Sequence, residues 1–386
     1  MAFDVTVIGL GAMGASTAYA LARRGARVVA IDPHPPSHDH GSSHGESRAF
    51  RIAYFEHPSY VPLARAALVA WRELERRTGK AILTTTGIVE AGHPGSPVVQ
   101  GSLNASSLHG LPHEIFSGRT LRSRFPQFHL PPDWLAVYQP DGGFLRPERA
   151  IQLQCRLAEE LGAELRIGTR ASAIRPRSGA VEIDTDRGTI EAGTVVVAAG
   201  GWIGDLVPEL KRHLTLTRQV AGWFHPKSPE EFTPERFPVF ILETEFDAIY
   251  GFPDFAGTGV KAASHHQSGL LAHADAATQD GGVADEGRIR AVIDRHLPEA
   301  AGVLNCLRTC FYTKTLDEDF VVDVHPDDPR IVIASPCSGH GFKFASIMGE
   351  ILADLAMRGE TSHDISRFNL KRLLQGQSSV LKSGSS

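Results

Sequence analysis

The sequence predicts an α/β protein in which a domain with a parallel sheet is interrupted by a second, β-rich domain. Three observations support this prediction. A strand, a glycine turn and a helix open the chain. Proline and glycine recur through a less regular region over residues 81–144, and alternating helical and strand patterns return after residue 145.

The opening unit has the pattern of a dinucleotide-binding turn. An apolar strand leads directly into G-L-G-A-M-G at residues 9–14, and small apolar residues then recur at helical spacing. Gly9 would permit the tight turn, Gly11 would let the backbone approach a pyrophosphate, and Gly14 would let the helix pack closely. A second strand ends at Asp32, where a carboxylate would accept hydrogen bonds from ribose hydroxyls. The unit predicts dinucleotide binding but does not distinguish FAD from NAD.

Later segments indicate that the first domain is discontinuous. Residues 194–202 form a buried strand pattern that ends in glycine, and residues 331–334 return to the parallel sheet before a closing helix. Several short strands and one amphipathic helix lie between these segments. We assign the first domain to residues 1–80, 145–215 and 322–386, and the second, substrate-binding domain to residues 81–144 and 216–321.

Composition excludes several classes of function. The 386 residues carry a formal charge of −5 and no long basic run, so nucleic acid is not an expected partner. No apolar run reaches the roughly 18 residues of a membrane span, and no basic leader marks a signal peptide. Four cysteines without CxxC spacing suit a reducing compartment. We therefore expect a cytoplasmic protein that is not bound to a membrane.

A polar loop with flanking glycines follows Asp32. It reads G-S-S-H-G-E-S-R over residues 41–48, and Arg51 comes three residues later. A planar guanidinium can hold a carboxylate through two charge-assisted hydrogen bonds, which makes Arg51 a candidate substrate ligand. The loop region also contains four histidines, but no cysteine or HExxH pairing accompanies them, so we expect no metal.

Three further motifs lie in the second half of the chain. Y-G-F-P at residues 250–253 is followed by Lys261 and His265, and T-C-F-Y-T occupies residues 309–313. S-G-H-G-F-K-F occupies residues 338–344, with Lys343 at the start of the closing helix. A cation there adds to the positive end of the helix dipole, an arrangement that favours an anionic ligand.

These motifs, in this order and approximate spacing, resemble the monomeric sarcosine oxidase and N-methyltryptophan oxidase family, whose FAD is attached through a cysteine sulfur. The resemblance covers essentially the whole chain. It implies a glutathione-reductase-type FAD-binding domain with an inserted antiparallel-sheet substrate domain. It also implies covalent FAD, joined at its 8α carbon to Cys310, with Cys337 as the competing attachment point.

The resemblance further implies a role for each motif residue. The catalytic residues would be Lys261, His265, Arg48, His44 and Tyr312. The substrate-binding residues would be Arg51, Lys343 and Tyr250. The cofactor-binding residues would be Gly9, Gly11, Gly14, Asp32, Ser43, Ser47, Ala171, Cys310, Gly339, Gly341, Phe342 and Lys343. Lys261, kept charged over the flavin, would stabilise superoxide as electrons pass to O2.

The implied reaction is oxidation of a secondary amino acid such as sarcosine, giving an imine, then an aldehyde and an amine, together with hydrogen peroxide. The expected partners are the amino acid and O2, and the expected state is a monomer. Relatives on this scaffold also oxidise pipecolate, proline and fructosyl amino acids, so these substrates remain open. An NAD(P)-dependent dehydrogenase would share the first 35 residues but would need neither Cys310 nor the glycine-rich turn before Lys343.

Overall fold

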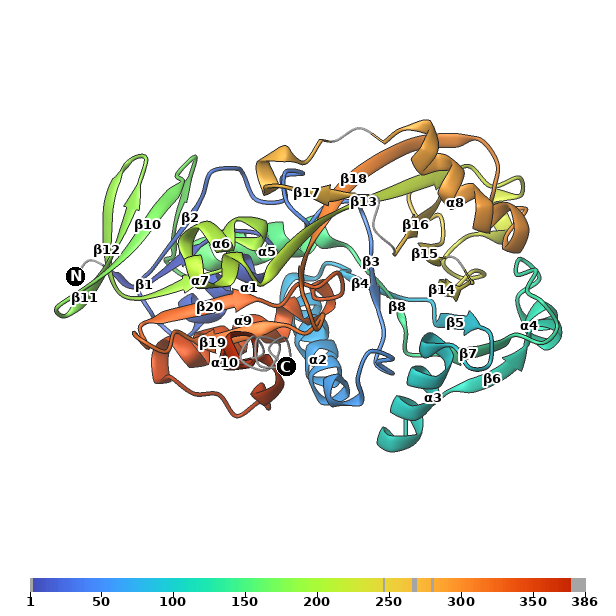
Figure 1. Ribbon diagram of the computed structural model, residues 1–386, viewed down its shortest axis with the longest axis horizontal. Helices are drawn as coiled ribbons and strands as arrows, with labels where there is room; N and C mark the ends of the chain where they lie inside the picture. Colours follow the sequence, from blue (N-terminus) through green and yellow to red (C-terminus); the bar gives the residue numbers. More distant parts are fainter. Residues whose placement is uncertain (1–2, 246, 266–268, 279–280, 376–386) are drawn as a thin grey trace, which may run out of the picture.

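The computed structural model describes residues 3–245, 247–265, 269–278 and 281–375. Figure 1 shows a parallel sheet with its helices at one end of the molecule and a second, mixed sheet at the other, whose long strands β13 and β18 extend toward the first sheet. Among the described residues, no helix is both long enough and apolar enough to cross a membrane.

The first sheet has five parallel strands in the order β9, β2, β1, β12 and β20. β19 pairs antiparallel with β20, and β10 and β11 form an antiparallel meander with the first half of β12. The strands span β1 (Phe3–Ile8), β2 (Val28–Asp32), β9 (Glu164–Ile167), β10 (Ala171–Arg177), β11 (Ala180–Thr185), β12 (Gly188–Val197), β19 (Val321–Val324) and β20 (Ile331–Ser335).

Alternation along the strands gives this sheet two apolar faces. Val5 and Val7 of β1 face one core with the helices α1, α5 and α9, whereas Ile8 joins a second core with Val195 and Val197. The helices of this region are α1 (Ala12–Arg23), α2 (Val61–Thr78), α5 (Pro147–Glu160), α6 (Ile203–Leu206), α7 (Pro208–Lys211), α9 (Ala345–Arg358) and α10 (Lys371–Gln375). Because both faces are covered, the strand ends are the parts of the sheet left for a ligand.

The second sheet is antiparallel except where β5 pairs in parallel with β14. Its strands are β5 (Ile88–Gly92), β6 (Glu114–Ser117), β7 (Leu135–Gln139), β13 (Leu214–Phe224), β14 (Val239–Glu243), β15 (Ala248–Phe252), β16 (Val260–Ser264), β17 (Leu270–Leu271) and β18 (Leu304–Thr315). A small third sheet contains β3 (Arg48–Phe50), β4 (Leu83–Thr85) and β8 (Gly143–Leu145). The domain boundaries assigned from the sequence stay a prediction.

Residues 81–144 are more regular than the sequence suggested, because α3 (Pro97–His109) and α4 (Gly118–Arg124) lie among their strands. Gly101 inside α3 obscured the helical pattern. It is required by packing, since a Cβ there would lie 2.2 Å from the carbonyl oxygen of Phe55. The remaining helix of the second region is α8 (Val283–His296). Short 3-10 helices occur at η1 (Pro58–Tyr60), η2 (Gly200–Trp202), η3 (Pro229–Glu231), η4 (Ala274–Ala276), η5 (Phe342–Phe344) and η6 (Ser366–Phe368).

Candidate active site

A cavity of about 580 Å³ is lined by residues of both large sheets. The carboxyl ends of β1, β2 and β12 contribute to its wall, as do β15, β18 and the turn that leads into η5. Most predicted site residues line it. Gly14, His44, Ser47 and Lys261 instead lie in the layer behind the wall. The fold therefore brings the separate sequence motifs to one place.

The glycine turn has the geometry of a nucleotide cradle. Gly9 has φ +97°, and a Cβ on Gly14 would lie 1.7 Å from the carbonyl oxygen of Gly9. Gly11 differs, because a Cβ there would meet only the Ser43 hydroxyl at 3.6 Å, so its backbone stays open to the cavity. Asp32 is buried and accepts a hydrogen bond from the backbone N–H of Leu10 at 2.7 Å. These features fit a pyrophosphate and a ribose at the amino end of α1.

The loop of residues 41–48 is held in shape by a carboxylate from α5. Glu148 accepts hydrogen bonds from the backbone N–H groups of Gly45 at 2.6 Å and Glu46 at 3.0 Å. Both loop residues have positive φ, +97° and +67°. Ser43 Oγ accepts from the N–H of Ala12, which ties the loop to the glycine turn. The strained loop thus presents carbonyl oxygens in a fixed orientation.

Lys261 is the cation that this loop surrounds. Its Nζ donates to the carbonyl oxygens of Gly45 at 2.7 Å and Ser47 at 3.1 Å, and it lies over the rings of Trp223 and Phe252. Burial, reinforced by the nearby positive charge of Arg48, lowers the pKa of Lys261 to about 7. The ammonium group is therefore held by neutral oxygens and rings.

Arg48 and His44 complete the part of the site around Lys261. Arg48 donates to the carbonyl oxygens of Ser47 at 2.8 Å and Ser42 at 2.9 Å. His44 is buried, and its Nε2 has no hydrogen-bond partner among the described residues. Burial and the charge of Arg48 lower the pKa of His44 to about 4, so the ring is neutral near pH 7. A buried imidazole nitrogen without a partner fits a site completed by a bound group.

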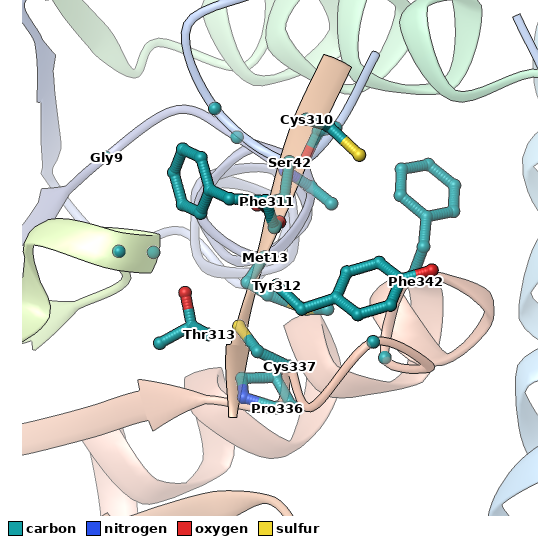
Figure 2. A pocket seen from close by; sticks show the side chains of 18 of the residues that line it. Gly9, Met13, Ser42, Cys310, Phe311, Tyr312, Thr313, Pro336, Cys337 and Phe342 are labelled. Atoms are coloured by element: carbon teal, nitrogen blue, oxygen red, sulfur yellow. Dashed lines mark hydrogen bonds between the residues drawn. The ribbon is translucent and has the colours of Figure 1, made fainter. Parts of the chain in front are cut away.

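The two candidate cysteines differ in their surroundings. Figure 2 shows Cys310 and Tyr312 on the same side of β18 as Phe342, and the sulfur atoms of Cys310 and Cys337 do not point toward one another. Burial raises the pKa of both thiols, that of Cys337 to about 11. Arg48 and Lys261 oppose this effect at Cys310. Cys310 is thus the thiol with cationic neighbours that favour a thiolate.

Arg51 is already occupied by carboxylates of the chain itself. Its Nη2 donates to Glu56 Oε2 at 2.6 Å, and its Nε lies 3.5 Å from Glu90 Oε1. The rings of Tyr54 and Phe55 each lie 4.1 Å from the guanidinium carbon. The sequence singled out Arg51 as a candidate substrate ligand but did not indicate either carboxylate.

Lys343 lies beside Arg51, within η5. Its Nζ donates to the carbonyl oxygen of His340 at 2.7 Å and to the hydroxyl of Tyr54 at 3.3 Å. Burial, together with the charge of Arg51, lowers the pKa of Lys343 to about 7. Trp71 Nε1 donates to the carbonyl oxygen of Lys343 at 2.8 Å and fixes the backbone there.

The turn before Lys343 itself requires its glycines, and their predicted role in binding the cofactor stays a prediction. A Cβ at Gly341 would lie 1.6 Å from the carbonyl oxygen of Pro336, and Gly339 has φ +83° and packs against the Tyr312 ring. Contacts within the turn therefore require these glycines, although both also line the cavity.

An aromatic group completes the wall opposite the glycine turn. The hydroxyls of Tyr250 and Tyr312 are 3.2 Å apart, and the His265 ring lies 6.3 Å and 5.9 Å from their rings. Burial raises the pKa of both tyrosines, so their hydroxyls stay protonated near pH 7. Ala171 and Phe342 also line the cavity.

Three carboxylates of the site were missed from the sequence: Glu56, Glu90 and Glu148. A signal existed for Glu90, which is the single acid in the apolar strand Ile88–Gly92, and for Glu148, which is an acid in the first turn of a helix. The described residues contain no group of three or more His, Cys, Asp or Glu that could hold a metal ion.

Comparison with known proteins assigns the chain to a family. The FAD dependent oxidoreductase (DAO) family matches residues 4–355. Monomeric sarcosine oxidase of Bacillus sp. (strain NS-129) is 38% identical over 96% of this chain and 97% of its own length. N-methyl-L-tryptophan oxidase of Yersinia pestis (strain Pestoides F) is 34% identical over 96% of this chain and 100% of its own length.

A solved structure gives the same result for the fold. NikD, an unusual amino acid oxidase essential for nikkomycin biosynthesis, aligns in its open form with a TM-score of 0.85 and 26% identity, covering 95% of this chain and 97% of its own. The family match also decides between FAD and NAD, which the glycine turn alone left open. The chain belongs to the FAD-dependent oxidoreductases of the DAO family and, within it, to the amine oxidases related to monomeric sarcosine oxidase and N-methyltryptophan oxidase.

Proposed function

We propose that this protein oxidises a secondary amino acid, with an N-methyl group or a cyclic amine, and uses O2 as the electron acceptor. The observation that carries the proposal is the pair of buried cation sites at one cavity. Arg51 and Lys343 form one site, and Lys261 with Arg48 forms the other. The names of the relatives favour an N-methyl amino acid as substrate.

The chain provides a place for each part of such a substrate. Arg51 and Lys343 would bind the carboxylate, because a guanidinium and an ammonium group face the cavity together. Tyr250, Tyr312 and His265 would surround the amine, with both tyrosine hydroxyls available as hydrogen-bond partners. Holding both groups would direct the C–H bond beside the nitrogen toward the cofactor.

FAD would be held by the glycine turn, Asp32 and the loop of residues 41–48. When bound, it would accept a hydride equivalent from the substrate carbon and pass two electrons to O2, giving hydrogen peroxide and an imine. Lys261 would hold a positive charge close to the place where O2 is reduced. His44 would stay neutral in the layer behind the cavity wall.

We also propose a covalent link between Cys310 and the 8α carbon of FAD. Arg48 and Lys261 support this choice, because they favour the thiolate of Cys310, whereas only the Ser335 hydrogen bond does so for Cys337. A cytoplasmic location and a monomeric state complete the proposal. Four unpaired cysteines support the cytoplasmic location, and the similarity to monomeric sarcosine oxidase supports the monomeric state.

The test is peroxide production by the purified, flavin-containing protein. The panel contains sarcosine, N-methyl-L-tryptophan, L-pipecolate, L-proline and a fructosyl amino acid, with N-methylbutylamine as a control that lacks the carboxylate. Peroxide is expected from at least one of the amino acids and not from the control. A protein that forms no peroxide with any of them, or that is colourless and binds NADH, would refute the proposal.

A further inference from the structure

Glu90 is a buried carboxylate that the proposed reaction does not use. It lies on β5 of the second sheet with no exposed surface, and it does not line the cavity. Its Oε1 lies 3.5 Å from Arg51 Nε and has no hydrogen-bond partner among the described residues. A carboxylate oxygen in this position faces the guanidinium from behind, away from any substrate.

Hydrogen bonds fix the other oxygen of Glu90. Oε2 accepts from the hydroxyl of Ser102 on α3 and from Nε2 of Gln139 on β7. Gln139 Oε1 in turn accepts from the backbone N–H of Ala53 at 2.9 Å, two residues after Arg51. This network joins the second sheet to the segment that carries Arg51, so Glu90 and Arg51 are held in register.

The buried charges around Arg51 determine what happens when a substrate carboxylate binds. Arg51 is a cation, and so is Lys343 when it is protonated; Glu56 and Glu90 can balance both charges when both carboxyl groups are ionised. A substrate carboxylate would then add a negative charge that nothing in this buried cluster balances, which is costly. Protonation of Glu90 removes the excess charge without moving any side chain.

We propose that Glu90 is a positioning residue that holds Arg51 from behind and takes up a proton when a substrate carboxylate binds. This inference rests on the proposed function, in which Arg51 binds that carboxylate. Burial raises the pKa of Glu90 to about 7, although Arg51 and the Ser102 hydrogen bond oppose the effect. The proton therefore exchanges with water within the ordinary working range of pH. Oε2 and the Ser102 hydroxyl can share it, since either oxygen can donate.

Glu90 has charged or polar neighbours on several of the elements packed against it, and the Tyr54 hydroxyl lies within electrostatic reach as well, whereas its partner on β14 is the apolar Ile241. Arg51 and Glu56 come from the segment after β3, Ser102 from α3, Gln139 from β7 and Lys343 from η5. Of these, Lys343 also titrates near pH 7 and becomes protonated more readily when an anion binds. A measurement of proton uptake must therefore separate Glu90 from Lys343.

The experiment measures acetate binding to the flavin-containing enzyme by calorimetry at pH 8 in buffers with different ionisation enthalpies. At this pH Glu90 is largely ionised before acetate binds, so the Glu90→Gln variant should take up about one proton fewer than the wild type. When Lys343 is first replaced by Met, adding Glu90→Gln should again reduce proton uptake by about one proton. The dissociation constant of acetate at pH 8 should be about tenfold lower in Glu90→Gln, because the amide is already neutral.

A second variant and a control sharpen the test. Ser102→Ala removes a donor that stabilises the Glu90 carboxylate, so the pH at which uptake by Glu90 is half complete should rise. Glu75→Gln is a matched control, because Glu75 accepts hydrogen bonds from the N–H groups of Ile82 and Leu83 and should not affect proton uptake.

Equal proton uptake in the wild type and Glu90→Gln would overturn this inference. If the wild type still forms peroxide from an amino acid in that case, the proposed function stands. A wild type that neither binds acetate nor forms peroxide would instead remove the proposed function, and the role of Glu90 with it.

Discussion

The two buried cation sites at the cavity are neutralised in different ways. Lys261 is held by the carbonyl oxygens of Gly45 and Ser47, and no carboxylate forms an ion pair with it in the described part of the chain. Arg51 instead contacts two carboxylates of the chain, those of Glu56 and Glu90.

This difference suggests different tasks. A cation held only by dipoles keeps an unbalanced charge that can stabilise a negative charge formed during a reaction. Arg51 pairs with one carboxylate at the cavity, that of Glu56, and such a cation is suited to binding a carboxylate that arrives from solution, because the incoming anion can replace Glu56. The first site therefore suits O2 reduction, and the second suits recognition of an amino acid.

The largest effect is expected at Cys310, which lies on the Lys261 side of this comparison. Cys310→Ala should abolish covalent attachment, because no other thiol has both Arg48 and Lys261 as neighbours among the described residues. Cys337→Ala should retain it. The measurement is flavin absorbance of the protein after acid precipitation. A Cys310→Ala protein that still carries flavin in the pellet would move the attachment site to Cys337.

Replacing the unpaired cation should slow the reaction with O2. Lys261→Met is expected to lower the second-order rate constant for O2 by about 10²–10³-fold, the usual cost of losing one fixed group that stabilises developing charge. Anaerobic bleaching of the flavin by substrate should change far less. Lys227→Met is the control, because Lys227 is exposed and pairs only loosely with Glu299 at 3.5 Å. Equal losses in both half-reactions would show that Lys261 also positions the substrate.

The pH dependence of the O2 reaction gives a second test of Lys261. Its pKa is lowered to about 7, so the cation is present below that pH and is lost as the pH rises above it. The O2 rate constant of the wild type should therefore fall as pH increases, by up to tenfold per unit well above the midpoint. A negative charge brought into the cavity would move the midpoint upward. Lys261→Met should show no such fall, and a parallel fall in that variant would assign it to another group.

At the second site, Arg51→Lys should weaken substrate binding. A lysine keeps the positive charge but cannot form two parallel bonds with a carboxylate, and it cannot fill the space between the rings of Tyr54 and Phe55. We expect KM to rise roughly 30-fold, which corresponds to about 2 kcal/mol. Steady-state peroxide assays measure this change. A loss confined to kcat would contradict a role in binding the carboxylate.

At both cation sites, the sequence predicted the motif residues better than the groups that neutralise or orient them. Gly9, Asp32, Arg51, Cys310 and Lys343 stand in recognisable local motifs, and the structure places all of them on one cavity. Local motifs depend on spacing along the chain, which a single sequence displays directly.

The groups that neutralise or orient these residues were not predictable in the same way. Glu90 reaches Arg51 across 39 positions of sequence, and Glu148 reaches Gly45 across 103. Such contacts depend on how the two sheets and α5 pack. The parallel pairing of β14 with β5, the strand that carries Glu90, also departs from the expected antiparallel sheet. A lone acid in an apolar strand was the available clue, and it carries no information about its partner.

The smallest effect is expected from Glu56, the carboxylate on the open side of Arg51. Burial alone would raise the pKa of Glu56, but the charge of Arg51 lowers it to about 2, so this group is ionised throughout the working range of pH. Glu56 lines the cavity and occupies the guanidinium nitrogen that a substrate carboxylate would use. Substrate binding must therefore displace or share this ion pair.

Glu56→Gln keeps the size of the side chain and one hydrogen-bond acceptor for Arg51 but removes the competing charge. We expect KM to fall about fivefold, or about 1 kcal/mol, because the Glu56 side chain is 22% exposed, which screens its attraction to Arg51, and the substrate now competes with a neutral amide. The rate constant for O2 should stay unchanged, since Lys261 belongs to the other site. An increase in KM would show that Glu56 orients Arg51 for the substrate. Both Glu56 and Glu90 would then position Arg51, and Glu56 would not compete with the substrate carboxylate.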